Sequence, residues 1–484
     1  MLYVQFGLYL ALMLGIGFYS MKKASSNELF IIGGRTLGPL TTAISAGASD
    51  MSGWLLLGLP GAVFASGLVE GLWISLGLTI GAYLNWLFVA GRLRVMSEKM
   101  QAVTLPSFIS RRFDDKKSIL KIVSTLVILV FFTLYVASGL KGGTLLFAHA
   151  FGASESIALL VTTLVVVSYT FLGGYLAVCW TDLIQGLLML TALVFCALLG
   201  FFAITGNGVD IGAVNPAAFK LTTGWITGAS LMAWGFGYFG QPHILARFFG
   251  IDSVKSVPRA RRIGISWMVI CLILASLIGI IGIGYNAANP LPGIAGEGGN
   301  PERIFLALTS ALFHPLFSGF VLAAVLAAVM STADSQLLVL TSSLTEDIPL
   351  IQKMDDRKKR WISRIGVAGF ALAAYLIAAT DSGSILHMVG YAWGGFGAAF
   401  GPLVILALVW RKTTWWGALA GMVSGALTIF VVKNYIKIPG EYFYELLPGF
   451  IIAFIAIVVV SLLTKKPAET TLELFDKTQQ EVHG

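Results

Sequence analysis

Residues 47–54 read GASDMSGW, and they lie inside a stretch from Pro39 to Ser66 that is otherwise almost wholly apolar. A carboxylate at the centre of a membrane helix costs about 2.5 to 3.5 kcal/mol on insertion scales, so Asp50 needs a partner that offsets its burial. The glycines and serines on either side of Asp50 weaken the helix at the same point. The stretch therefore predicts a membrane helix that is interrupted near its middle, where backbone carbonyl oxygens become free.

The composition of the whole chain indicates an integral membrane protein. Of 484 residues, 57% are hydrophobic and only 12% are charged, so most of the surface faces hydrocarbon and membrane lipid is a constant partner. Apolar runs extend from end to end, which predicts one polytopic domain over residues 1–464 and a mobile cytoplasmic tail over 465–484. The net charge of +8 argues little for nucleic acid, because Lys and Arg cluster between the apolar runs, where membrane topology explains them.

Each bilayer crossing needs about 20 apolar residues as a helix. The candidate spans number about thirteen: 2–20, 39–66, 70–95, 119–148, 155–178, 182–205, 224–244, 263–286, 304–345, 361–380, 385–410, 414–434 and 443–464. Basic residues follow the first, third, seventh, ninth, eleventh and thirteenth spans, and Lys and Arg are retained on the cytoplasmic side. We therefore expect the N-terminus outside and the C-terminus in the cytoplasm.

A second interruption is predicted in the seventh span, where residues 232–248 read MAWGFGYFGQPHILARF. Glycines and Pro242 at membrane depth weaken the helix and open backbone hydrogen bonds. The two interrupted spans are five spans apart, which is the spacing of two inverted five-helix repeats whose first helix is broken. We expect these repeats over 39–205 and 224–410, with 1–20 as an additional first span and 414–464 as the last two.

The interruption in the second span offers oxygen ligands for a cation. Hard cations such as sodium prefer carbonyl, hydroxyl and carboxylate oxygens, so the freed carbonyls of Ala48 and Met51 are candidate ligands. Asp50 would then couple to the cation, directly or through its neighbours. In the alternative interpretation, Asp50 only caps the second half of the helix by accepting N–H bonds near Gly53.

The ninth span carries a second group of oxygens in LAAVMSTADSQLLVLTSSLTED, residues 326–347. Ala328, Ser331, Thr332 and Ser335 are spaced by three and four residues and so share one helix face. Serines in membrane helices often bond only to a carbonyl one turn earlier, which is the alternative here. Asp334 strengthens the interpretation as a cation site, because a buried carboxylate needs a cation or a donor.

The seventh span also carries the best candidate for a substrate slot. Trp234 and Tyr238 are four residues apart on a glycine-rich helix and can line a small apolar slot, while an exposed half-helix N-terminus can receive a carboxylate. An amino acid would fit both features, although an aromatic stripe that merely fills gaps between helices is the alternative.

A further carboxylate, Asp182, lies at the start of the predicted sixth span and can be explained as a helix N-cap. The sequence contains no HExxH motif, nucleophile elbow or paired cysteines, so it does not indicate an enzyme.

The stretches SAGASDMSGWLLLGLPGAVF, GWITGASLMAWGFGYFGQPHILARFF and LAAVMSTADSQLL resemble the sodium:solute symporter family, and within it the bacterial sodium/proline symporters. The resemblance runs almost from end to end. Further matching stretches are GGRTLGP at 33–39, AGRLRV at 90–95, FFTLYVASG at 131–139 and YAWGGFGAAFGP at 391–402.

The resemblance implies an all-α integral membrane protein of the bacterial plasma membrane, with thirteen spans around two inverted five-helix repeats like the leucine-transporter fold. It implies symport of Na+ and L-proline by alternating access. The implied sodium site uses carbonyls of Ala48, Met51 and Ala328 with hydroxyls of Ser331 and Thr332, and Asp50 shapes it. The implied proline residues are Ser52, Gly53, Trp54, Tyr135, Trp234, Tyr238 and Pro242. Some relatives bind a second sodium, which here would involve Asp182, Asp334 and Ser335. A proton-coupled transporter, or a sodium-coupled transporter of another small organic solute, remains the alternative.

Overall fold

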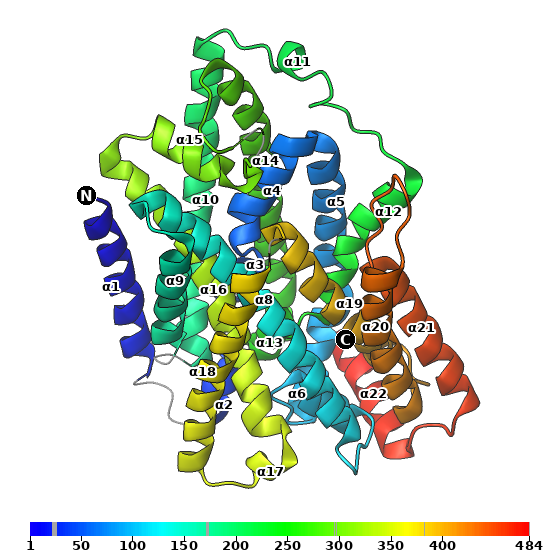
Figure 1. Cartoon of the computed structure of the whole chain (residues 1–484). Coiled ribbons are helices and arrows are strands. Elements are labelled where there is room, and N and C mark those ends of the chain that lie inside the picture. Colours follow the sequence, from blue (N-terminus) through cyan, green and yellow to red (C-terminus); the bar gives the residue numbers. More distant parts are fainter. Residues whose placement is uncertain (22–26, 171–173, 295, 297, 382, 484) are drawn as a thin grey trace.

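The computed structural model describes residues 1–21, 27–170, 174–294, 296, 298–381 and 383–483 (Figure 1). These residues form helices joined by turns, and no strand is assigned among them. The basic pair expected after the first span, Lys22 and Lys23, lies outside the described residues. In Figure 1, α1 stands at one edge of the helix bundle, while α20 and α21 stand at the opposite edge.

Ten helices in the described part are long and apolar enough to cross a membrane. One of them is continuous over Leu68–Lys99 and combines α5 (Leu68–Leu84), a π-helical segment η3 (Asn85–Ala90) and α6 (Gly91–Lys99). The other nine are α1 (Leu2–Met21), α8 (Ile119–Phe151), α10 (Tyr175–Gly206), α14 (Val257–Ala288), α16 (Pro315–Asp347), α18 (Asp356–Thr380), α19 (Ile385–Val409), α20 (Trp415–Tyr435) and α21 (Leu446–Leu463).

Three of the predicted spans correspond to shorter helices. The fifth is α9 (Glu155–Thr170), and the second and seventh are the two interrupted spans described next. The predicted ninth span begins too early, because residues 304–345 hold two helices: α15 (Ile304–Leu312) ends before Pro315 starts α16. The remaining short elements are α2 (Asn27–Ile32), η1 (Gly33–Arg35), α7 (Leu105–Arg112), α11 (Ile211–Val214), η5 (Val254–Ser256), η6 (Pro301–Arg303), α17 (Pro349–Gln352) and α22 (Glu469–His483).

Both predicted interruptions are present. In the second span, α3 (Pro39–Asp50) ends at the carboxylate, Met51 has a non-helical ψ of 74°, and the chain resumes as η2 (Trp54–Gly58) and α4 (Leu59–Ser66). In the seventh span, α12 (Trp225–Met232) passes into a 3₁₀ segment η4 (Ala233–Gly240), and α13 (Pro242–Gly250) follows. Pro242 begins α13, where its missing N–H costs no helical hydrogen bond.

Glycines on α5 bring its backbone against the interrupted seventh span. A Cβ added at Gly77 would lie 2.3 Å from the carbonyl oxygen of Met232, and one added at Gly81 would lie 2.1 Å from that of Gly235. Small residues spaced by four let membrane helices approach this closely. The irregular segment η4 is therefore held by α5 at a distance that larger side chains would not permit.

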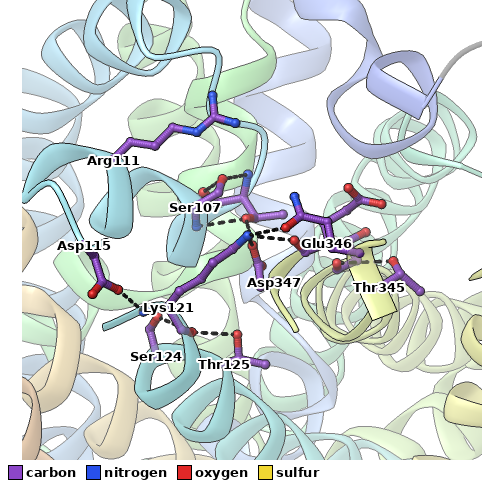
Figure 2. A network of polar contacts seen from close by, with 12 residues as sticks. Ser107, Arg111, Asp115, Lys121, Ser124, Thr125, Thr345, Glu346 and Asp347 are labelled. Atoms are coloured by element: carbon purple, nitrogen blue, oxygen red, sulfur yellow. Dashed lines mark hydrogen bonds and ion pairs between the residues drawn. The ribbon is translucent and has the colours of Figure 1, made fainter. Parts of the chain in front are cut away.

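The C-terminal end of α16 is anchored by a buried polar network (Figure 2). Asp347 accepts a hydrogen bond from the hydroxyl of Thr104 at 2.8 Å and lies 3.7 Å from the ammonium of Lys121 on α8. Lys121 also donates to the backbone carbonyl of Glu346 at 2.8 Å. Because Thr104 caps α7, the network joins α16 to both α7 and α8.

The prediction of a mobile tail is wrong for residues 469–483, which form α22 and dock on the bundle. Asp476 pairs with Arg411 through two contacts of 3.0 and 2.9 Å, and Glu481 lies 2.7 Å from Lys99 on α6. Phe475 is only 6% exposed, and the guanidinium of Arg112 lies 5.4 Å from its ring centroid. An amphipathic helix with one buried aromatic side chain thus covers this end of the bundle.

Candidate functional site

Oxygens from the second and ninth spans meet inside the bundle. The hydroxyl of Ser331 on α16 donates to the carbonyl of Ala48 on α3 at 2.8 Å, and it also lies 3.2 Å from the carbonyl of Ala328. Ser331, Ala48 and Ala328 have no solvent-exposed surface. Ala48 and Ser331, which are 283 positions apart in the sequence, therefore meet at one buried polar contact.

The group is chemically suited to a monovalent cation. The oxygens are carbonyl and hydroxyl oxygens, which alkali cations accept as ligands. The hydroxyl oxygen of Thr332, next to Ser331, is buried without a hydrogen-bond partner among the described residues, and Met51 is fully buried beside the end of α3. Within the same part of the chain, no cluster of His, Cys, Asp and Glu could hold a transition metal. As a sodium site, this group stays a prediction.

Asp50 is fixed by aromatic side chains at the end of α3. Its carboxylate accepts a hydrogen bond from the hydroxyl of Tyr238 in η4. Its backbone carbonyl accepts from the indole N–H of Trp54 at 3.0 Å and from the hydroxyl of Tyr135 on α8 at 3.2 Å. The alternative in which Asp50 caps the second half-helix is wrong, because η2 has no side-chain cap and the carboxylate reaches Tyr238 instead.

The predicted substrate residues lie around this carboxylate. The rings of Trp54 and Trp234 lie 6.4 Å apart, and the ring of Tyr238 meets Trp393 edge-on at 5.1 Å. Trp393 on α19 donates its indole N–H to the carbonyl of Trp234 at 2.7 Å. These contacts build an aromatic wall that borders Asp50.

The remaining predicted substrate residues lie on the backbone turns of the two breaks. Ser52 is 1% exposed and its N–H donates to the carbonyl of Asp50 at 2.8 Å, while Gly53 packs against Val329 of α16. Pro242 is buried at the first position of α13. The preceding residue, Gln241, donates to backbone carbonyls of η4 and α19.

A guanidinium lies among the residues suggested for a second sodium. Asp182 and Ser335 do come together, but both contact Arg247 of α13: Arg247 pairs with Asp182 at 2.9 Å and donates to the hydroxyl of Ser335. Ser45 also donates to Asp182 at 2.6 Å. The N-cap interpretation of Asp182 is wrong, because α10 begins at Tyr175 and Asp182 lies two turns inside it. Asp334 is buried on α16 next to Ser335.

Comparison with known proteins identifies the family. The model of the sodium:solute symporter family matches residues 30–425. The osmoregulated proline transporter OpuE of Bacillus subtilis is 46% identical over 483 residues, which cover 98% of this chain and 96% of that protein. The sodium/proline symporter of Escherichia coli is 45% identical over 491 residues, covering 99% of this chain and 97% of that protein. The chain belongs to the sodium:solute symporter family.

Solved structures confirm the fold expected for this member of the sodium:solute symporter family. A sodium-coupled sialic acid symporter in a substrate-bound outward-open state matches with a TM-score of 0.79 and 20% identity, over 96% of this chain and 98% of that one. The nucleobase-cation-symport transporter Mhp1 matches with a TM-score of 0.56 and 14% identity, over 93% and 95%. The leucine-transporter-like, all-helical membrane fold is therefore confirmed.

Two aromatic residues of this sodium:solute symporter were missed as site residues. Trp393 lies in the stretch YAWGGFGAAFGP at 391–402, whose glycines were a usable signal for close helix packing: a Cβ at Gly397 would lie 2.8 Å from the Cα of Gly237 in η4. Tyr444 stacks on Trp234 with ring centroids 5.2 Å apart. It lies in a connecting segment without any motif, so the sequence contained no signal for it.

Proposed function

We propose that this protein is a secondary active symporter that couples inward sodium movement to uptake of L-proline by alternating access. The observation that carries the proposal is the contact between the Ser331 hydroxyl and the Ala48 carbonyl, which joins α16 to the broken end of α3. The relatives named as proline transporters and sodium/proline symporters support the substrate and the ion.

The proposed coupling runs through the end of α3. Sodium bound by oxygens of Ala48, Met51, Ala328, Ser331 and Thr332 holds the last turn of α3 against α16. That turn presents Asp50, whose carboxylate accepts from Tyr238 and whose carbonyl accepts from Trp54 and Tyr135. Ion binding therefore orders the aromatic wall that receives the proline ring, together with the half-helix ends that receive its carboxylate. In this scheme sodium favours the outward-open state, and closure and inward opening follow once proline is bound.

We propose one sodium per cycle, because the chain supplies its own cation at the second position. The guanidinium of Arg247 already neutralises Asp182 and occupies the hydroxyl of Ser335, so sodium would bring a second positive charge into a buried site. A tenfold sodium gradient and 100 mV of potential together supply about 3.7 kcal/mol for one ion, which supports roughly 500-fold proline accumulation. A second sodium at Asp182, Asp334 and Ser335 is the alternative.

The test is uptake of labelled proline into proteoliposomes with an imposed sodium gradient. We expect uptake that requires sodium and a steady-state accumulation ratio that rises tenfold for each tenfold increase in the gradient. A hundredfold rise in this ratio for each tenfold increase in the gradient would establish two sodium ions per proline instead. Uptake that persists without sodium at low pH would support proton coupling, and failure of excess proline to compete would support another solute.

The proposed orientation places the N-terminus outside and the face carrying α22 in the cytoplasm of a bacterial cell, as the basic loops indicate. The three native cysteines, Cys179, Cys196 and Cys271, are buried, so single introduced cysteines can report sidedness. A cysteine at exposed Trp225 should react with a membrane-impermeant reagent added to intact cells, and one at exposed Leu350 should not.

A further inference from the structure

The segment between α20 and α21, residues 436–445, covers part of the aromatic wall. Its residue Tyr444 is 1% exposed and stacks on the indole of Trp234 with an interplanar angle of 28°. The hydroxyl of Tyr444 donates to the backbone carbonyl of Gly390 on α19 at 2.7 Å. The ring is therefore held in place by a stacking contact on one helix and a hydrogen bond on another.

The same segment is tied to the first half of the interrupted seventh span. Glu441 accepts from the backbone N–H of Thr227 at 3.1 Å and from its hydroxyl, and the N–H of Tyr442 donates to that hydroxyl at 3.0 Å. Glu445, beside Tyr444, lies 4.0 Å from Lys433 of α20. Because these contacts reach α12, α19 and α20, the position of Tyr444 depends on how those three helices are arranged.

A cavity of about 460 Å³ adjoins the other side of this segment. Its wall includes Tyr444 together with His387, Lys433, Glu441 and Glu445, and it is open to the surface. Tyr444 thus borders the cavity and covers Trp234 at the same time. The Tyr444 ring therefore lies between the cavity and Trp234.

We propose that Tyr444 is a specificity-determining residue that forms the roof of the substrate slot and limits the size of the ring accepted against Trp234. This inference rests on the proposed function, since it takes the slot at Trp234 to be the place where proline binds. A rigid aromatic ring over a tight apolar slot discriminates against one extra methylene group, and such a group typically changes binding by about 10- to 200-fold. Stacking on Trp234 keeps the ring in the covering position, and the hydrogen bond to Gly390 adds a second contact.

The experiment compares sodium-dependent binding of L-proline and L-pipecolate, its six-membered-ring homologue, to purified full-length protein. Tyr444→Ala should weaken proline binding at least fivefold and lower the preference for proline over pipecolate at least tenfold. The half-saturating sodium concentration should stay within twofold. Tyr444→Phe keeps the ring and should keep the preference within twofold.

Two further variants separate this role from a loss of folding. Tyr444→Leu preserves buried apolar volume without a flat ring, and it should lower the preference as Tyr444→Ala does. Tyr435→Ala removes a tyrosine that is 75% exposed at the end of α20, and it should bind both ligands like the wild type. A preference unchanged in both Tyr444→Ala and Tyr444→Leu would overturn the proposal. Failure of the proposed function looks different, because the wild type would then show no sodium-dependent proline binding at all.

Discussion

Replacing Ser331 by alanine removes one candidate sodium ligand and one contact between α3 and α16. The hydroxyl of Ser331 donates a hydrogen bond to the carbonyl of Ala48, 2.8 Å away. When a cation takes both oxygens as ligands, that hydrogen must rotate away and the hydrogen bond is lost. The substitution therefore removes a stabilising contact from both the free and the ion-bound state, and the two losses have opposite effects on sodium affinity.

The two effects can be weighed against each other. An oxygen that contacts a charged group contributes about 1.5 to 3 kcal/mol, whereas a neutral hydrogen bond contributes about 1 kcal/mol. Alanine loses the first in the bound state, but it no longer has the second to break on binding. The difference is about 0.5 to 2 kcal/mol, which raises the half-saturating sodium concentration about 2- to 30-fold.

The assay is thermal unfolding of the purified protein over a range of sodium concentrations, since a ligand that binds only the folded state stabilises it increasingly as the ligand concentration rises above its dissociation constant. Thr341→Ala is the matched control. Thr341 lies about 15 Å further along the same helix, and its buried hydroxyl donates to the carbonyls of Leu337 and Leu338 of that helix. Equal sodium dependence in wild type, Ser331→Ala and Thr341→Ala would refute the assignment of the ion site.

Three further predictions concern other parts of the chain. Asp50→Asn should weaken sodium binding by about tenfold or more, because a buried negative charge near the ion is lost; an unchanged sodium titration would contradict this. The carboxylate of Glu302 accepts backbone N–H bonds at the start of α19, and burial raises its pKa above the ordinary value of about 4.5. Protonation of Glu302 therefore stabilises the folded state at low pH, and this stabilisation is lost as the pH rises from about 4.5 through the raised pKa. Glu302→Gln should therefore flatten the pH dependence of thermal stability, and an identical profile would exclude this role. Phe475→Ala should weaken the docking of α22 on the bundle by about 3 to 5 kcal/mol, whereas Asp476→Asn, at an exposed ion pair, should weaken it by less than about 1 kcal/mol. Hydrogen exchange in α22 that is equally fast in the two variants would contradict this ranking.

Much of the architecture could be predicted from local features of the chain. The break after Asp50 follows from a carboxylate flanked by glycines, and the break before Pro242 follows from a residue that cannot donate a backbone hydrogen bond. The predicted ninth span starts earlier than α16 because the apolar run continues through α15. Composition alone does not reveal the turn that precedes Pro315. The docking of α22 was missed because the tail is polar overall and buries only one face.

The candidate site shows where such prediction stops. Ser331 and Thr332 were recognisable as oxygen donors, but nothing local indicated that Arg247 would reach Asp182 from a different helix. A guanidinium near the end of a predicted span looks like a topology signal when it is considered alone. Its burial beside a carboxylate is a property of the packed bundle.

The sequence by itself determined which segments enter the membrane, where two of them break and which side chains carry oxygen at the breaks. These features follow from the cost of burying charge and from residue propensities, which act within a few positions along the chain. Only the tertiary structure decided that Ser331 touches Ala48, that Arg247 neutralises Asp182 and that Tyr444 lies over Trp234. Each of these contacts joins residues far apart in sequence, so it exists only after the helices have packed, and helix packing depends on the shape of the whole bundle.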